Sequence, residues 1–150
     1  MLFGKRKQVV KRILIVEDEP LTAFDNENML GDAGYEIVAT VDDLEEALKV
    51  LEREEVHLIL SDVRLRGDRT GIELAHAAKA KGVPTLFATG HSHPDAAQIA
   101  VGCVHKPYTE RQLCQAIEAI DRHLQGHKVK PPKGVELFII TGDSDGDSED

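Results

Sequence analysis

The sequence predicts an α/β protein: a doubly wound parallel sheet with helices on both faces. Short apolar runs rich in β-branched residues alternate, five times, with segments in which apolar residues recur at helical spacing. Strands that alternate with helices in this way form a parallel sheet with right-handed crossovers. The length of 150 residues suits one domain with a core of ordinary size.

The first three elements follow from local signals. Residues 12–16 are a β-branched apolar run, which predicts a buried strand. Pro20 suits the first turn of a helix that ends between Gly31 and Gly34. Residues 36–40 predict the second strand. The residues expected near one face of the helix are Leu21, Phe24, Asn28 and Ala33.

The middle of the chain repeats this order. Asp42 and Asp43 are expected to cap a helix, and residues 57–61 predict a third strand that runs into Asp62. A polar loop then leads to a helix over residues 71–81. The apolar positions of the helix after Asp43 are Leu44, Ala47, Leu48 and Leu51.

The last two strands are expected at residues 85–88 and 101–105, with a weak helix over residues 95–100 between them. Thr109 is expected to cap the final helix. The buried stripe predicted for that helix is Leu113, Ile117, Ile120 and Leu124.

Both ends of the chain differ in composition from the main domain, residues 12–125. Residues 1–11 are expected to form a basic leader, and residues 126–150 a linker and an acidic, disordered tail. Residues 135–140 are mostly apolar and are expected to form a sixth strand parallel to the fifth. The alternative is that they pair with the same edge of a second molecule in a swapped homodimer.

The overall composition excludes several classes of protein. A net charge of −9 argues against nucleic-acid binding, and no apolar run approaches the ~20 residues needed to cross a membrane. Cys103 and Cys114 lack the spacing of a redox or metal motif. We therefore expect a cytoplasmic protein with reduced cysteines.

Polar side chains gather where the predicted strands end. Glu17 and Asp18 follow the first strand, Asp62 ends the third, and Thr89 and Lys106 follow the fourth and fifth. These ends share one edge of a doubly wound sheet, where such folds bind ligands. Clustered carboxylates repel one another, so a divalent cation is expected among them, and oxygen ligands favour Mg²⁺.

A carboxylate beside Mg²⁺, a lysine and a hydroxyl is suited to accept a phosphoryl group. Taken singly, each of these residues is more simply read as a turn former or a solvated side chain. Five such residues at four strand ends of one edge make coincidence improbable.

Residues 12–125 resemble the receiver domain of two-component response regulators. The matching motifs are Val16-Glu17-Asp18, Leu60-Ser61-Asp62, Ala88-Thr89 and Lys106-Pro107. The resemblance implies a flavodoxin-like fold with strand order 2-1-3-4-5.

The resemblance also implies a role for each site residue. Asp62 would be the phospho-acceptor, and Thr89 the hydroxyl that responds to phosphorylation. Lys106 would contact the phosphoryl group and join Pro107 through a cis bond. Besides Asp62 itself, Mg²⁺ would be held by Glu17, Asp18 and the carbonyl of Arg64.

Residues 84–90 further resemble the FATGUY subgroup of receivers, which act with HWE-type sensor kinases. Typical receivers carry an aromatic residue three positions before the lysine, where this chain has Cys103. The segment between Thr89 and Lys106 is also short, which implies a shortened fourth helix.

Most response regulators continue into a DNA-binding or enzymatic domain, and the 25 residues after Gln125 are too few for either, so we expect a stand-alone receiver. The resemblance implies that a sensor histidine kinase or a histidine phosphotransfer protein phosphorylates it. It would signal by changed contacts with a downstream protein. One alternative is a Mg²⁺-dependent phosphohydrolase with an aspartate nucleophile, although position 64, where its general acid would stand, is Arg64. The other is a receiver-like interaction module that is never phosphorylated.

Overall fold

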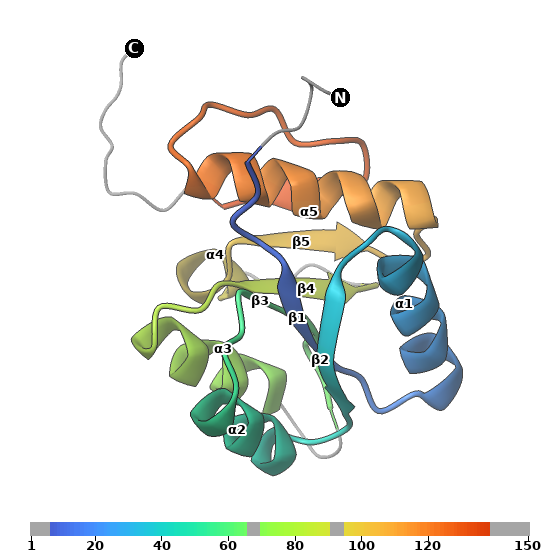
Figure 1. Ribbon diagram of the computed structural model, residues 1–150, viewed down its shortest axis with the longest axis vertical. Coiled ribbons are helices and arrows are strands. Elements are labelled where there is room, and N and C mark those ends of the chain that lie inside the picture. The colour runs from blue at the N-terminus through green and yellow to red at the C-terminus, as the bar shows by residue number, and fades with distance from the viewer. Residues whose placement is uncertain (1–6, 66–69, 91–94, 139–150) are drawn as a thin grey trace.

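The computed structural model describes residues 7–65, 70–90 and 95–138, and its eleven elements alternate between strand and helix (Figure 1). In chain order they are β1 (Arg12–Val16), α1 (Pro20–Asp32), β2 (Glu36–Val41), α2 (Leu44–Arg53), β3 (Leu58–Asp62), α3 (Thr70–Ala80), β4 (Thr85–Thr89), α4 (Ala96–Ile99), β5 (Gly102–His105), α5 (Glu110–Leu124) and β6 (Val135–Leu137). The predicted alternation of strands and helices is therefore confirmed.

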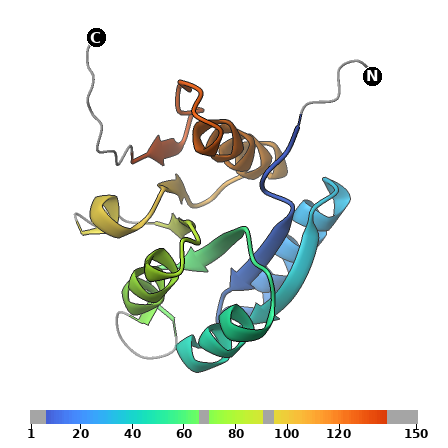
Figure 2. The same ribbon diagram turned by 60° about the vertical axis from the view of Figure 1, so that its left-hand side comes forward.

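One six-stranded sheet runs through the molecule in the order β2-β1-β3-β4-β5-β6, and β1 to β5 are parallel (Figure 2). Helices α1 and α5 cover one face, and α2, α3 and α4 cover the other. Alternate residues of a strand face opposite sides, so Ile13 and Ile15 pack toward α1 and α5, while Leu14 and Val16 pack toward α2 and α3. The doubly wound fold and its order 2-1-3-4-5 are confirmed.

Helix ends follow the sequence signals closely. Asp43 accepts a hydrogen bond from the amide of Glu46 at 2.9 Å, which caps α2. Thr109 and Gln112 form a capping box at the start of α5. The fourth helix has only four residues, as expected from the short segment that contains it.

Three apolar side chains lie differently from what helical spacing suggests. Leu124 was expected in the buried stripe of α5, but it is the last residue of that helix and is exposed, because it lines an open hollow together with Val101 and Phe138. Leu21 and Phe24 of α1 are also exposed, whereas Asn26 and Leu30 form the buried side of that helix.

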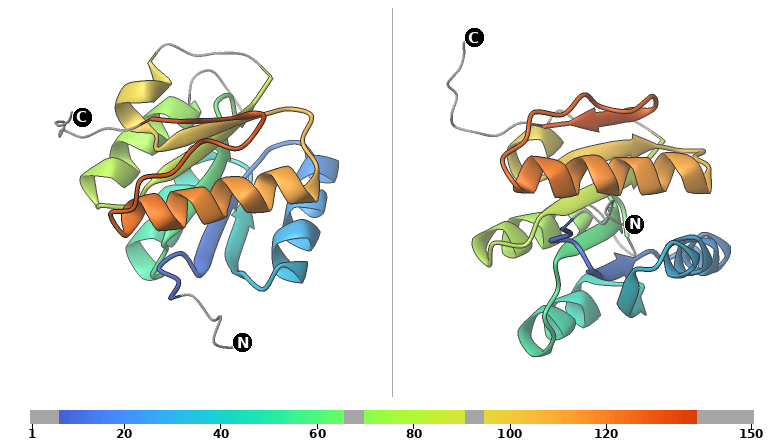
Figure 3. Two further views of the ribbon diagram at one scale, coloured as in Figure 1. Left: turned by 90° about the horizontal axis from the view of Figure 1, so that it is seen from above. Right: turned by 45° about the horizontal axis from the view of Figure 1, so that its top comes forward.

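The extra C-terminal strand is present, but its predicted direction was wrong: β6 pairs with β5 in antiparallel orientation. The fifteen residues of α5 span ~22 Å at helical rise, and the extended linker of residues 126–134 reaches about as far. The linker therefore runs back along much of α5 and starts β6 beside the end of β5 (Figure 3). There the amide of His105 donates to the carbonyl of Gly134 at 3.0 Å.

No helix in the described ranges is long and apolar enough to cross a membrane. Several expectations concern residues outside those ranges. They are the N-terminal part of the basic leader (residues 1–6), the end of the predicted sixth strand (139–140) and the acidic tail (143–150).

Candidate functional site

Strand register brings the predicted site residues to one edge of the sheet. Val16 pairs with Ser61, Asp62 with Ala88, and Thr89 with His105, so the four strands end at nearly the same level. Side chains that follow these ends therefore meet at the carboxyl edge of the sheet, where doubly wound folds bind ligands.

Lys106 lies between two of the three carboxylates. Its Nζ is 2.9 Å from Oδ2 of Asp62 and 3.5 Å from Oε1 of Glu17. The third carboxylate, Asp18, is exposed, and no group of three acidic, histidine or cysteine side chains forms a metal-binding cluster in the described residues. The ammonium group of Lys106 therefore offsets part of the repulsion expected among the carboxylates, although Asp62 and Asp18 still raise the pKa of Glu17.

Glu17 is the most deeply buried of the three carboxylates at this edge. Its residue is 4% exposed, and this desolvation raises the pKa of its carboxyl group, although the amide of Glu19 donates to Oε2 at 3.0 Å and Lys106 is close. Burial opposes the charge of Lys106 as well. The hydrogen bond to Asp62 and the negative charges of Asp62 and Glu17 outweigh this effect of burial. The pKa of Lys106 is therefore raised, and its ammonium group stays protonated at neutral pH.

We predict that Glu17→Gln stabilises the metal-free protein at neutral pH, with a rise in Tm of a few degrees. Because burial raises the folded-state pKa of Glu17, ionisation of this group costs stability as pH rises through that pKa. Glutamine removes the charge and can still accept from the Glu19 amide. Thermal unfolding in EDTA at neutral and acidic pH tests this. A Tm below that of the wild type at neutral pH would contradict the prediction, and the difference should vanish at acidic pH.

The backbone around Asp62 holds its carboxylate at the edge. The amide of Arg64 donates to Oδ1 of Asp62 at 3.2 Å, and Ser61 Oγ donates to the Asp62 carbonyl at 2.8 Å. A Cβ atom at Gly71 would lie 2.3 Å from the carbonyl oxygens of both Asp62 and Val63. Only glycine lets α3 begin this close to the site, a requirement that sequence reasoning missed.

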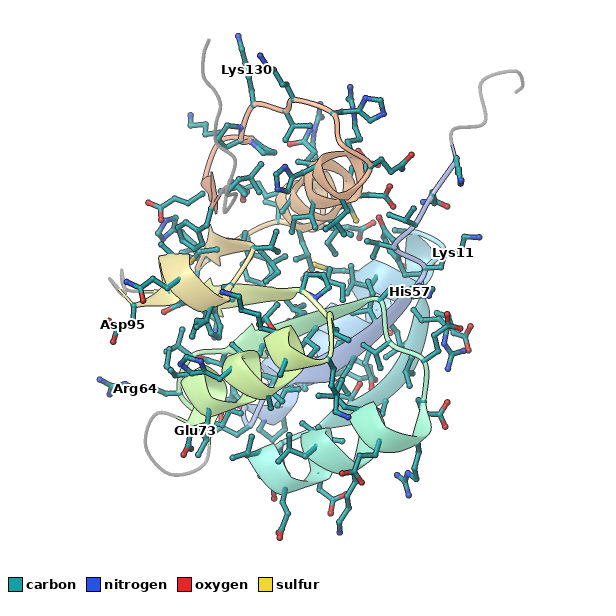
Figure 4. The ribbon with its side chains drawn as sticks, turned by 90° about the vertical axis from the view of Figure 1, so that its left-hand side faces the viewer. Lys11, His57, Arg64, Glu73, Asp95 and Lys130 are labelled. Carbon is teal, nitrogen blue, oxygen red and sulfur yellow. The ribbon has the colours of Figure 1, made fainter. Side chains whose placement is uncertain are left out.

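The other predicted residues lie at the same edge. Thr89 is buried, and its carbonyl accepts from the amide of Lys106 at 2.9 Å. The bond between Lys106 and Pro107 is cis. The side chain of Arg64 points away from the molecule (Figure 4), so only its backbone is available to the site.

A hollow of about 440 Å³ lies between α1 and residues 106–108, which precede α5. Within it, the hydroxyl of Tyr108 donates to Oδ1 of the buried Asn26 at 2.8 Å. Sequence reasoning missed this contact, since the two residues are 82 positions apart. The lining residues are Thr22, Asp25, Asn26, Met29, Lys106, Pro107 and Tyr108.

The donors at this edge suit Mg²⁺ in their chemistry. Asp62 and Asp18 offer carboxylate oxygens with access to solvent, and no histidine or cysteine lies among the donors expected from the sequence. Mg²⁺ is usually held by one or two carboxylates together with several waters, so it does not require a cluster of three acidic side chains.

A doubly wound sheet with carboxylates and a lysine at its carboxyl edge is the arrangement that the receiver-like motifs of the sequence imply. The model of the response regulator receiver domain matches residues 13–118, and the chain belongs to this family. The resemblance of residues 12–125 to the receiver domain is confirmed.

Curated proteins with similar sequences match this chain over part of their own length. The transcriptional regulatory protein PdtaR of Mycobacterium tuberculosis is 34% identical over 116 residues, which cover 73% of this chain and 56% of PdtaR. The chain thus spans about half the length, or less, of the curated relatives it matches.

Two solved structures are similar at a comparable level. SdrG from Sphingomonas melonis is 31% identical with a TM-score of 0.63, and the match covers 75% of this chain and 97% of SdrG. The response regulator PhyR from Brucella abortus is 26% identical with a TM-score of 0.66, over 80% of this chain and 51% of PhyR.

Proposed function

We propose that the receiver domain accepts a phosphoryl group on Asp62 from a phosphohistidine of a sensor kinase or a phosphotransfer protein. One carboxylate oxygen of Asp62 attacks the phosphorus atom, and the bond between phosphorus and the imidazole nitrogen breaks. The imidazole leaves with the electron pair of that bond and takes up a proton. Hydrolysis of the acyl phosphate later returns Asp62 and inorganic phosphate.

The contact between Lys106 and Asp62 carries this proposal. An ammonium group 2.9 Å from the acceptor carboxylate is placed to offset charge on the transferring phosphoryl oxygens. The raised pKa of Lys106 keeps that charge present at neutral pH. Thr89, on the neighbouring strand end, would offer its hydroxyl to one of those oxygens.

Mg²⁺ would be held by Asp18 and Asp62, with Glu17 and the carbonyl of Arg64 completing the protein ligands. When bound, it supplies a Lewis acid that offsets negative charge on the phosphoryl group. Two side chains of the protein would take part directly. Asp62 would provide the nucleophile, and the ammonium group of Lys106 would shift from the carboxylates to the phosphoryl oxygens.

Incubation of the wild-type protein with acetyl phosphate tests the proposal. Intact-mass measurement should show one added phosphate with Mg²⁺ and none in EDTA, and peptide mapping should place it on Asp62. Labelling that is independent of Mg²⁺, or located on another residue, would contradict the assignment. So would an unmodified protein.

The phosphodonor partner would dock over the start of α1. Leu21 and Phe24 are 75% and 59% exposed, and they lie on the helix that follows Glu17 and Asp18 directly. Exposed apolar residues beside a hollow that reaches Lys106 suit an amphipathic helix that carries the phosphohistidine. After phosphorylation, the protein would signal through changed contacts with a downstream protein.

We predict that the double variant Leu21→Ala/Phe24→Ala slows phosphotransfer from a phosphorylated histidine kinase or phosphotransfer protein by about tenfold or more, because apolar anchors of this kind dominate binding. The exposed Leu124, at the far end of α5, provides the matched control Leu124→Ala. Labelling by acetyl phosphate reports whether the double variant keeps its fold and its site. Equal phosphotransfer by the double variant and the control would exclude docking at α1.

A further inference from the structure

The edge of β5 is shaped to receive β6. Gly102 pairs with Leu137, and a Cβ atom at Gly102 would lie 2.7 Å from the carbonyl oxygen of Glu136. Only glycine permits this approach of two backbones. Val135 is buried in the same apolar cluster as Val104. The position of β6 is thus encoded in β5 as well as in β6 itself.

Contacts of β6 lie on both sides of Lys106. Before it, the amide of His105 donates to the carbonyl of Gly134 at 3.0 Å, and His105 Nε2 is 3.8 Å from Oε2 of Glu136. After it, the backbone of Gly134 lies close to the side chain of Gln112: a Cβ atom at Gly134 would be 3.0 Å from Nε2 of Gln112. The segment that carries Lys106 is therefore fixed at two points by residues 134–136.

Gln112 links this packing to the loop after Lys106. The side-chain Oε1 of Gln112 accepts from the backbone amide of Thr109 at 2.9 Å, and the backbone amide of Gln112 donates to Oγ1 of Thr109 at 3.1 Å. On the opposite side of β5, the amide of Lys106 is bonded to Thr89 of β4. Without β6, the four-residue β5 would be an edge strand paired on one side alone, with fewer protected backbone hydrogen bonds to resist local opening.

We propose that β6 is a positioning element of the phosphoacceptor site: docked against β5, it holds Lys106 at Asp62. This inference rests on the proposed function and adds a second site that acts on it. Because a well-placed Lys106 favours the phosphorylated form, docking of β6 favours phosphorylation of Asp62. Linkage then requires that phosphorylation favours docking of β6 by the same factor.

Gly102→Ala in the full chain tests the first direction. The new Cβ would collide with the backbone of β6, whereas its nearest neighbour in β4, Leu86, is at an ordinary 3.6 Å. Gly31→Ala is the matched control, because nothing lies within 4 Å of its Cβ position. Gly102→Ala should lower the initial rate of labelling by acetyl phosphate about fivefold or more, because it displaces Lys106 from the reacting group, and Gly31→Ala should not.

The background of Lys106→Met separates positioning from general loosening of the fold. If β6 acts through Lys106, adding Gly102→Ala to Lys106→Met should not slow labelling further. Equal slowing by Gly102→Ala with and without Lys106 would overturn the proposal. A wild-type rate in Gly102→Ala, with β6 shown to be undocked by hydrogen exchange, would overturn it too.

Hydrogen exchange of the wild-type protein tests the reverse direction without any substitution. The amide of Phe138 donates to the carbonyl of Val101 at 2.9 Å and reports whether β6 is docked. Phosphorylation, verified by mass, should slow its exchange about fivefold or more, and unchanged or faster exchange would overturn the proposal. A wild-type protein that takes up no phosphate would instead overturn the proposed function, and with it this inference.

Discussion

The Asp62→Asn variant should take up no phosphate from acetyl phosphate and Mg²⁺ under conditions in which the wild-type protein takes up one. An amide is not a nucleophile toward phosphorus at neutral pH, so the loss should be complete within detection, about a hundredfold or more. The substitution keeps the shape of the side chain, and its oxygen can still accept from the amide of Arg64. Lys106 retains Glu17 as a partner, so the fold should persist.

Asp32→Asn is the control for this experiment, since Asp32 is an exposed carboxylate at the C-terminal end of α1, the end that lies away from the site. It should be labelled like the wild-type protein. Intact mass gives the number of phosphates per chain, and thermal unfolding confirms that both variants are folded. Labelling of Asp62→Asn at the wild-type rate would mean that another residue is the acceptor.

Lys106→Met should have the second largest effect, on phosphorylation and on stability together. Removing a charged donor aimed at the reacting group costs about 10²–10³-fold in rate, and labelling by acetyl phosphate should fall by this much. The same substitution leaves the buried carboxylate of Glu17 without its cation. At neutral pH we expect the free energy of unfolding to fall by about 1–3 kcal/mol, less than for a fully buried pair because Lys106 is partly exposed.

The pH dependence identifies the cause of this loss. The carboxyl pKa of Glu17 is raised by burial, and loss of Lys106 raises it further. Protonation of Glu17 removes the unpaired charge, so the deficit in stability should shrink as pH falls through that raised pKa. Urea unfolding at neutral and acidic pH measures this change. A deficit that is the same at both pH values would show that lost packing, not charge, is responsible.

The double variant Lys106→Met/Glu17→Gln separates the two effects of the lysine. It should recover most of the stability lost in Lys106→Met, because no buried charge is left unpaired. Its phosphorylation should remain as slow as that of the single variant, since the ammonium group is still missing. Recovery of the phosphorylation rate would mean that Lys106 acts by supporting the fold rather than by contacting the phosphoryl group.

The sequence by itself determined the elements and the edge at which the site lies. Strand and helix periods are local properties, and so are the capping residues Asp43 and Thr109. A residue that ends a parallel strand must lie at the carboxyl edge of the sheet, so the sequence predicts that Asp62 and Lys106 are neighbours, as their contact confirms.

Only the tertiary structure decided which groups touch one another there. Lys106 bridges Asp62 and Glu17, so repulsion among the carboxylates is smaller than their count suggested. The contact between Tyr108 and Asn26 joins residues far apart in the chain, and no local pattern encodes such a pair. The exposure of Leu21 likewise depends on how α1 is rotated against the sheet, which its own spacing does not set.

The direction of β6 also depends on the tertiary structure. The apolar character of residues 135–137 indicated a strand, and the open edge of β5 indicated its place. Strand direction, however, depends on which end of β5 the linker reaches. The linker is long enough to retrace α5, and Gly102 admits the backbone of β6 once it arrives there. Composition predicts that a strand forms, but the reach of the preceding chain and the shape of the receiving edge determine how it pairs.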